Sequence, residues 1–227
     1  MFERPRRDGN KHLMGLRNYA LADRAIMLLD ALLGASTALA ARPDQPSPAG
    51  DLPEGIAAPA DRAAAARLMR VNHTGEVCAQ ALYLGQAALA IDDDLVRLLE
   101  NAALEEREHL DWCRQRLQEL DSRPSLLDPA WFAGSFALGA LAAATGDSRS
   151  LGFLEETERQ VVQHLEEHLQ RLPTADRRSR AILQRMRRDE ARHAETAARA
   201  GASRLPLPVR LAMRAQAGVM KALAARF

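Results

Sequence analysis

The chain has few aromatic residues, which make up only 4% of its 227 positions. Strands favour aromatic and β-branched residues, whereas Ala and Leu, which are abundant here, favour helices. No segment alternates apolar and polar residues over a sustained length, so we expect no strands. The sequence therefore predicts an all-α protein.

Cysteine is also scarce, and the two that occur, Cys78 and Cys113, lie far apart and form no Cys-x-x-Cys pair. This excludes a disulfide framework and favours a reducing, cytoplasmic setting, with both thiols as small core residues. The formal net charge is only +1, so no overall field favours a nucleic-acid partner.

Long hydrophobic runs are missing as well, since none reaches the roughly 20 uncharged residues that a membrane-spanning helix needs. The apolar run 27–40 ends in an Ala-Leu-Ala that resembles a signal-peptide cleavage site. However, Asp30 interrupts it and charges of both signs precede it, so we do not expect secretion.

Proline divides the chain into two parts. Five prolines fall within residues 42–60, which excludes a regular helix there. We expect residues 1–60 to hold an amphipathic helix (about 16–41) and this linker, and residues 61–227 to form a helical bundle. Helical patterns cover about 62–91, 93–120, 150–172, 175–200 and 207–227, and the uncharged run 130–146 lies between the second and the third.

One pattern occurs twice along the bundle: a Glu on one helix, then Glu-x-x-His on the next. The first copy is Glu76 with Glu106 and His109, and the second has Glu190 and His193 preceded by a Glu on the helix at about 150–172. Glu and His three residues apart share a helix face, and four such helices are typical of ferritin-like di-iron and di-manganese proteins. One copy alone would be typical of a solvated helix face.

The charge balance favours two divalent metals, because four carboxylates offset their total charge, and carboxylate-rich sites suit iron or manganese better than zinc. Two choices stay open from spacing alone. Glu155, Glu156 and Glu158 are equally good candidates on their helix. Glu105 and Asp189 share a face with the histidines, and we expect them to lie behind the ligands or in solvent.

The motifs Met69-Arg70-Val71-Asn72-His73-Thr74-Gly75-Glu76, Glu106-Arg107-Glu108-His109, Glu158-Arg159-Gln160-Val161 with His164, and Asp189-Glu190-Ala191-Arg192-His193 resemble the demethoxyubiquinone hydroxylase family, in its bacterial form. The resemblance covers about 67–200. It implies a di-iron enzyme that hydroxylates the ring of a demethoxyubiquinol intermediate in ubiquinone synthesis.

The resemblance also implies a ligand set. One iron would be held by Glu76, Glu106 and His109, and the other by Glu158, Glu190 and His193. Glu106 and Glu190 would lie nearest both metals, with Glu158 as a further candidate bridge. His73 and His164 would lie behind the ligands.

Such an enzyme implies O₂ as co-substrate and electrons from outside the chain, because no dinucleotide-binding glycine motif and no cysteine cluster is present. A partner, a small reductant or the quinol itself could supply them. A polyprenyl quinol implies peripheral docking on the cytoplasmic face of the cell membrane, and further quinone-synthesis proteins as candidate partners. Either Ala130–Gly146 or the helix with Arg210, Arg214, Lys221 and Arg226 would dock there, unless these segments are a buried crossover and a packed terminal helix.

Two other classes of function compete. A ferritin-, rubrerythrin- or manganese-catalase-like protein would store metal or handle peroxide in the same bundle. A non-enzymatic scaffold or lipid-binding protein of quinone synthesis would keep the fold without the chemistry.

Overall fold

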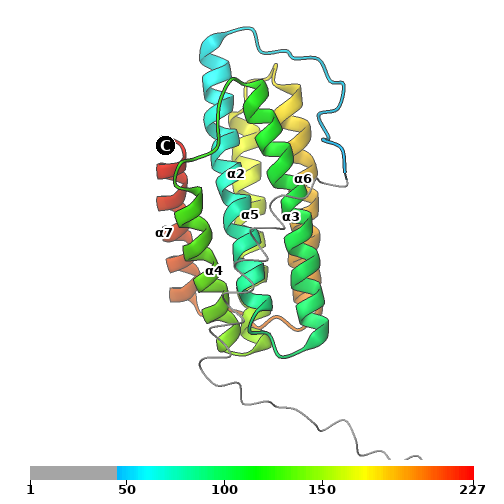
Figure 1. Ribbon diagram of the computed structural model, residues 1–227, viewed down its shortest axis with the longest axis vertical. Coiled ribbons are helices and arrows are strands. Elements are labelled where there is room, and N and C mark those ends of the chain that lie inside the picture. Colours follow the sequence, from blue (N-terminus) through cyan, green and yellow to red (C-terminus); the bar gives the residue numbers. More distant parts are fainter. Residues whose placement is uncertain (1–44) are drawn as a thin grey trace, which may run out of the picture.

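The computed structural model describes residues 45–227 (Figure 1). This part contains six helices and no strands, which confirms the all-α prediction. The predicted helix at about 16–41 lies outside the described residues. The helices are α2 (Pro59–Ala87), α3 (Asp93–Glu119), α4 (Asp128–Ala144), α5 (Asp147–Arg171), α6 (Arg177–Arg199) and α7 (Leu207–Ala224).

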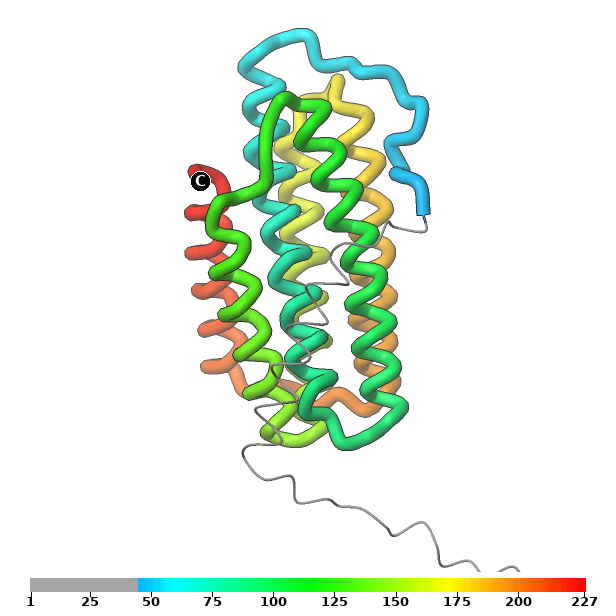
Figure 2. The backbone as a smooth tube through the Cα atoms, viewed as in Figure 1, coloured from blue at the N-terminus to red at the C-terminus, as the bar shows by residue number. Residues whose placement is uncertain are grey.

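Four of the helices, α2, α3, α5 and α6, form the bundle, with α2 packing on α3 and α5, and α6 packing on α5 and α3. The connection from α3 to α5 carries α4, so the bundle has one long crossover. Both α4 and α7 pack on α2 and α5, on the side away from α3 and α6 (Figures 1 and 2). No helix within residues 45–227 is long and apolar enough to cross a membrane.

Local signals set the helix ends. The side chain of Asp92 accepts hydrogen bonds from the backbone N–H groups of Asp94 and Leu95, and Asp176 caps α6 through Ser179 N–H. Helix α2 ends at Ala87 rather than near residue 91 as predicted. Asp92 already caps α3, and the residues between Ala87 and Asp92 are needed for the turn between the two helices.

Two glycines bring the α2 and α4 backbones into contact. A Cβ atom at Gly85 would lie 2.1 Å from the carbonyl oxygen of Phe136, and one at Gly139 would lie 2.1 Å from that of Leu82. Only glycine leaves room for such a close approach between backbones. The uncharged run is therefore a helix held tightly against α2.

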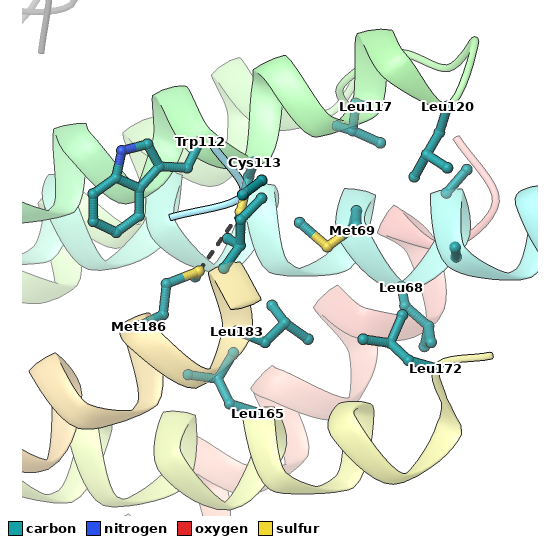
Figure 3. Packing of buried hydrophobic residues seen from close by; sticks show 14 of the residues in the cluster. Leu68, Met69, Trp112, Cys113, Leu117, Leu120, Leu165, Leu172, Leu183 and Met186 are labelled. Atoms are coloured by element: carbon teal, nitrogen blue, oxygen red, sulfur yellow. Dashed lines mark hydrogen bonds between the residues drawn. The ribbon is translucent and has the colours of Figure 1, made fainter. Parts of the chain in front are cut away.

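The apolar core consists of two clusters with a polar layer between them. On α2 one cluster includes Met69 and the other includes Tyr83, and the polar layer lies at the positions between these residues. In the first cluster Cys113 packs against Met186, with 3.8 Å between their sulfur atoms (Figure 3). Both cysteines are free thiols, as expected, with Cys113 in the core and Cys78 half-buried.

The described part of the Pro-rich segment, residues 45–58, forms no helix and packs on the bundle. Ile56 is buried, and Glu54 pairs with the fully buried Arg116 at 2.7 Å. At the start of the segment, the backbone oxygen of Gln45 accepts a hydrogen bond from Trp112 Nε1 at 3.3 Å. The side-chain oxygen of Gln45 accepts one from Arg185 at 3.3 Å. These contacts fix the segment against α3 and α6.

Candidate metal centre

Six carboxylate and imidazole side chains from the four bundle helices meet in the polar layer. Each is at most 7% exposed. They form two groups of four, and within each group the potential ligand atoms lie within 4.8 Å of one another. The first group is Glu76, Glu106, His109 and Glu190; the second is Glu106, Glu158, Glu190 and His193. Glu106 and Glu190 belong to both, so the two groups form one continuous centre.

The two histidines occupy equivalent places. His109 Nδ1 lies 3.0 Å from both Glu106 Oε2 and Glu190 Oε1, and 3.6 Å from Glu76 Oε2. His193 Nδ1 lies 3.1 Å from Glu190 Oε2, 3.3 Å from Glu106 Oε1 and 3.6 Å from Glu158 Oε1. This symmetry follows from the repeated Glu-x-x-His, which puts each pair on one inward helix face.

The outer nitrogen of each histidine faces another carboxylate. His109 Nε2 lies 3.3 Å from Asp189 Oδ2, and His193 Nε2 lies 3.1 Å from Glu105 Oε2. A carboxylate at Nε2 keeps a proton on that nitrogen, so Nδ1 is the nitrogen that would bind a metal once it has lost its own proton, as is usual for histidine ligands. The sequence left open whether Glu105 and Asp189 lie behind the ligands or in solvent, and in the structure both contact the histidines from behind.

Arginines hold these outer carboxylates ionised. Asp189 accepts a hydrogen bond from Arg185 Nε at 2.7 Å, and Glu105 pairs with Arg192. Burial opposes ionisation of Asp189, but hydrogen bonds from His109 and Arg185 lower its pKa to about 2. The hydrogen bond from His193 lowers the pKa of Glu105, against a smaller effect of burial.

Among the inner groups, burial and the neighbouring carboxylates raise the pKa of Glu76 and of Glu158 well above the usual range. Burial also opposes the charged form of Glu106, yet hydrogen bonds from His109 and His193 lower its pKa. Burial lowers the pKa of both imidazoles, but the surrounding carboxylates outweigh this effect and raise it above the usual range. The centre therefore holds protons that cations can displace.

The donor set fits two divalent ions. It offers four carboxylates and two imidazole nitrogens, a combination that suits iron or manganese. One buried oxygen, Glu158 Oε2, has no hydrogen-bond partner within the described residues, and Glu106 Oε1 and Glu190 Oε1 each face only a histidine Nδ1. Unpartnered buried oxygens are costly unless something binds them, and metal ions would do so.

On α5 the three candidate carboxylates have separate partners. Glu155 pairs with Arg159 at 2.6 Å, and Glu156 pairs with Arg210 of α7 at 2.8 Å. Only Glu158 points into the centre, where Tyr83 donates a hydrogen bond to it. Burial and the charge of Glu158 raise the pKa of Tyr83, so its hydroxyl stays protonated.

The sequence analysis missed Tyr83. It lies seven residues after Glu76, which is two helical turns and therefore the same face of α2. This spacing was the available signal. It could have drawn attention to the residue, but it could not have named Glu158 as the partner.

His73 and His164 contact other groups. His73 Nδ1 lies 3.0 Å from Asp128 Oδ2 on α4, and His164 packs against His168 with ring centroids 3.8 Å apart. Within the described residues neither imidazole forms an ion pair with a carboxylate of the centre.

A cavity of about 330 Å³ lies beside the centre, between α2, α4, α5 and α7. Glu76 is part of its wall, together with apolar residues that include Leu82, Leu138, Phe153 and Met220. Most of the cavity surface is apolar, although about half of its lining residues carry polar side chains, and a cavity of this size and character can hold a small organic molecule.

Comparison with known proteins identifies the family. A solved bacterioferritin-related protein from Bacteroides fragilis, a dodecameric thioferritin, matches with a TM-score of 0.51 at 20% identity, covering 59% of this chain and 81% of that one. It confirms the ferritin-like fold.

Curated relatives are far more similar in sequence. A 3-demethoxyubiquinol 3-hydroxylase from Xanthomonas campestris pv. campestris (strain 8004) is 58% identical over 184 residues, which cover 81% of this chain and 85% of the relative. One of the same name from Paracidovorax citrulli is 56% identical over 199 residues, covering 87% and 97%. The family model described as Ubiquinone biosynthesis protein COQ7 matches residues 63–224, and the chain belongs to this family.

Proposed function

We propose that the chain is a 3-demethoxyubiquinol 3-hydroxylase, an O₂-dependent di-iron monooxygenase of ubiquinone biosynthesis. The observation that carries the proposal is the position of Glu76, which belongs to the first group of candidate ligands and also lines the cavity. A molecule in that cavity lies directly beside the centre. The relatives at 56–58% identity that carry this name support the choice of substrate.

Glu76, Glu106, His109 and Glu190 would hold one iron, and Glu106, Glu158, Glu190 and His193 the other. Bound iron would supply the redox chemistry that activates O₂ for insertion into the ring. The protein fixes the histidine tautomers through Asp189 and Glu105. It also keeps water away, since all six candidate ligands are buried.

Electrons must come from another molecule, because the sequence has neither a dinucleotide-binding motif nor a cysteine cluster. A partner protein, a small reductant or the quinol itself fits this requirement.

The outer surface of α7 supports peripheral docking on the cytoplasmic face of the cell membrane. Its apolar side chains Leu207, Leu211 and Val219 are 62%, 52% and 56% exposed. Ala224 is its one buried residue, and no acidic residue follows Glu195. An apolar face accompanied by basic residues fits an anionic bilayer surface.

In contrast, α4 buries Phe136, Ala140 and Ala143 against the bundle, although its Leu141 is 64% exposed. We therefore assign the main contact to α7. Liposomes of anionic lipid should sediment the protein, and replacing Leu211 and Val219 by Asp should leave it in the supernatant. Sedimentation unchanged by both substitutions would refute this surface.

The function is tested in a bacterial strain that lacks its own ring hydroxylase and receives this chain. The strain alone should accumulate a quinone that lacks one ring oxygen. The chain should restore ubiquinone, and a Glu190→Ala variant should not. A quinone profile left unchanged by the intact, metal-loaded chain would reject the proposal, and peroxide consumption or metal storage without hydroxylation would favour the ferritin-like alternative.

A further inference from the structure

His164 of α5 lines the cavity, yet neither of its ring nitrogens has a hydrogen-bond partner within the described residues. Both nitrogens are shielded from water, and a buried polar atom without a partner is costly. Such an atom in a cavity wall is available to bind a polar group of a ligand. Two polar residues of the wall close to it in sequence are already engaged, since Gln160 donates to Glu156 at 2.8 Å and Thr157 to a backbone oxygen.

A neighbouring histidine holds the His164 ring in place. His168 lies one helical turn further on, and the two ring planes meet at 60°. His168 Nδ1 lies 2.9 Å from the side-chain oxygen of Asn72, which is on α2 and also lines the cavity. Because the amide oxygen can only accept, His168 donates from Nδ1. The α2–α5 contact thereby fixes His168, and His168 fixes His164.

The imidazole of His164 is neutral. Burial, together with the nearby His168, Lys221 and Arg171, lowers its pKa to about 2. A neutral imidazole has one donor and one acceptor nitrogen. It can therefore donate to a carbonyl or accept from a hydroxyl, the two states of a quinone ring oxygen.

We propose that His164 binds a ring oxygen of the quinone substrate, and that Asn72 and His168 position it for this. The inference rests on the proposed function. The ring would lie in the cavity that His164 and Glu76 both line, with one oxygen on His164 and the rest of the molecule against the apolar wall. His164 thus sets which part of the ring is presented to the centre.

The test compares two ligands on the full chain by isothermal titration calorimetry. One is a short-tailed demethoxyubiquinone, and the other is the same alkylated ring with hydrogen in place of both quinone oxygens. The unmodified protein should bind the quinone roughly tenfold more tightly, the value of one hydrogen bond that is lost without replacement. His164→Phe should bind both ligands with similar affinity.

Three variants complete the design. His164→Asn, which keeps a donor and an acceptor, should recover part of the preference. His168→Phe should lose part of it, and Glu155→Gln is a control on the same helix but outside the cavity that should keep it. Circular dichroism checks that each variant folds, and His164→Asn serves in place of His164→Phe if the latter does not.

The outcomes separate the two proposals. No binding of the quinone to the unmodified protein would overturn the proposed function. A tenfold preference that survives in His164→Phe would overturn the role of His164 and leave the function standing. If only His164→Asn folds, a preference that is not reduced at all in that variant would have the same meaning.

Discussion

Sharing of Glu106 and Glu190 between the two groups predicts that different ligand substitutions remove different numbers of ions. Glu76 belongs to one group only, so Glu76→Gln should abolish one metal position and preserve the other. Glu190→Gln should weaken both. Glutamine keeps the shape of each side chain, so the loss of charge and of a metal ligand is the main change.

The magnitude follows from linkage between binding and folding. At a free-ion concentration about 100 times Kd, each ion adds about 2.7 kcal/mol to the free energy of unfolding. Two ions add about 5 kcal/mol, which raises Tm by roughly 10–20 °C for a chain of this length. The rise on loading Glu76→Gln should be about half of that, and Glu190→Gln should show almost none.

The assay is elemental analysis after anaerobic loading with iron, combined with thermal denaturation of the loaded and metal-free protein. We expect about two ions in the unmodified chain, about one in Glu76→Gln and much less than one in Glu190→Gln. Glu155→Gln is the matched control, because Glu155 pairs with Arg159 outside the centre and should keep two ions. Equal loss of metal in Glu76→Gln and Glu190→Gln would refute the shared-ligand geometry.

Three further changes test the surroundings of the centre. Tyr83→Phe removes the donor to Glu158 and should weaken metal binding roughly 10–100-fold in a chelator competition, as loss of a group behind the ligands usually does. Gly139→Ala places a Cβ against backbone on α2 and should lower the free energy of unfolding by about 1–3 kcal/mol in urea. Burial lowers the pKa of His164 to about 2 and of His168 to about 3 in the folded protein, so below about pH 6.5 the unfolded chain takes up protons first. Stability should then fall with falling pH by up to about 1.4 kcal/mol per unit for each histidine, and replacing both by Phe should flatten the slope.

The glycine substitution has a control in the chain, and each of the three predictions has an outcome that would contradict it. Gly134 lies on the same helix as Gly139 with nothing within 4 Å of an added Cβ, so Gly134→Ala should cost little. Equal destabilisation by both substitutions would contradict the close contact of α2 and α4. Unchanged metal affinity in Tyr83→Phe would remove that hydrogen bond from the centre. An undiminished pH slope in the double Phe variant would assign the slope to other groups.

The sequence predicted five of the six described helices, all but α4, and the doubled motif, because these depend on local periodicity. Glu106 with His109, and Glu190 with His193, follow from the fixed geometry of residues three apart on a helix. Two such helix faces, each preceded by a helix with a further Glu, favour a shared buried metal site over two solvated faces. This argument needs no knowledge of loops or packing.

What depends on contacts between helices could not be predicted in this way. Glu155, Glu156 and Glu158 lie within one helical turn, and the rotation of α5 that selects Glu158 is set by its neighbours α2 and α6. The position of α4 likewise depends on Gly85 and Gly139 meeting across the interface, and a single glycine in an apolar helix does not reveal its partner.

The course of residues 45–58 has a practical consequence. Gln45 lies against Trp112 and Arg185 on α3 and α6, whereas the cavity opens among α2, α4, α5 and α7. A protein immobilised through a cysteine introduced at position 45 would be attached at the α3–α6 side. The cavity and α7 would then face the solution, an orientation suited to measuring vesicles and quinones on the same sensor surface.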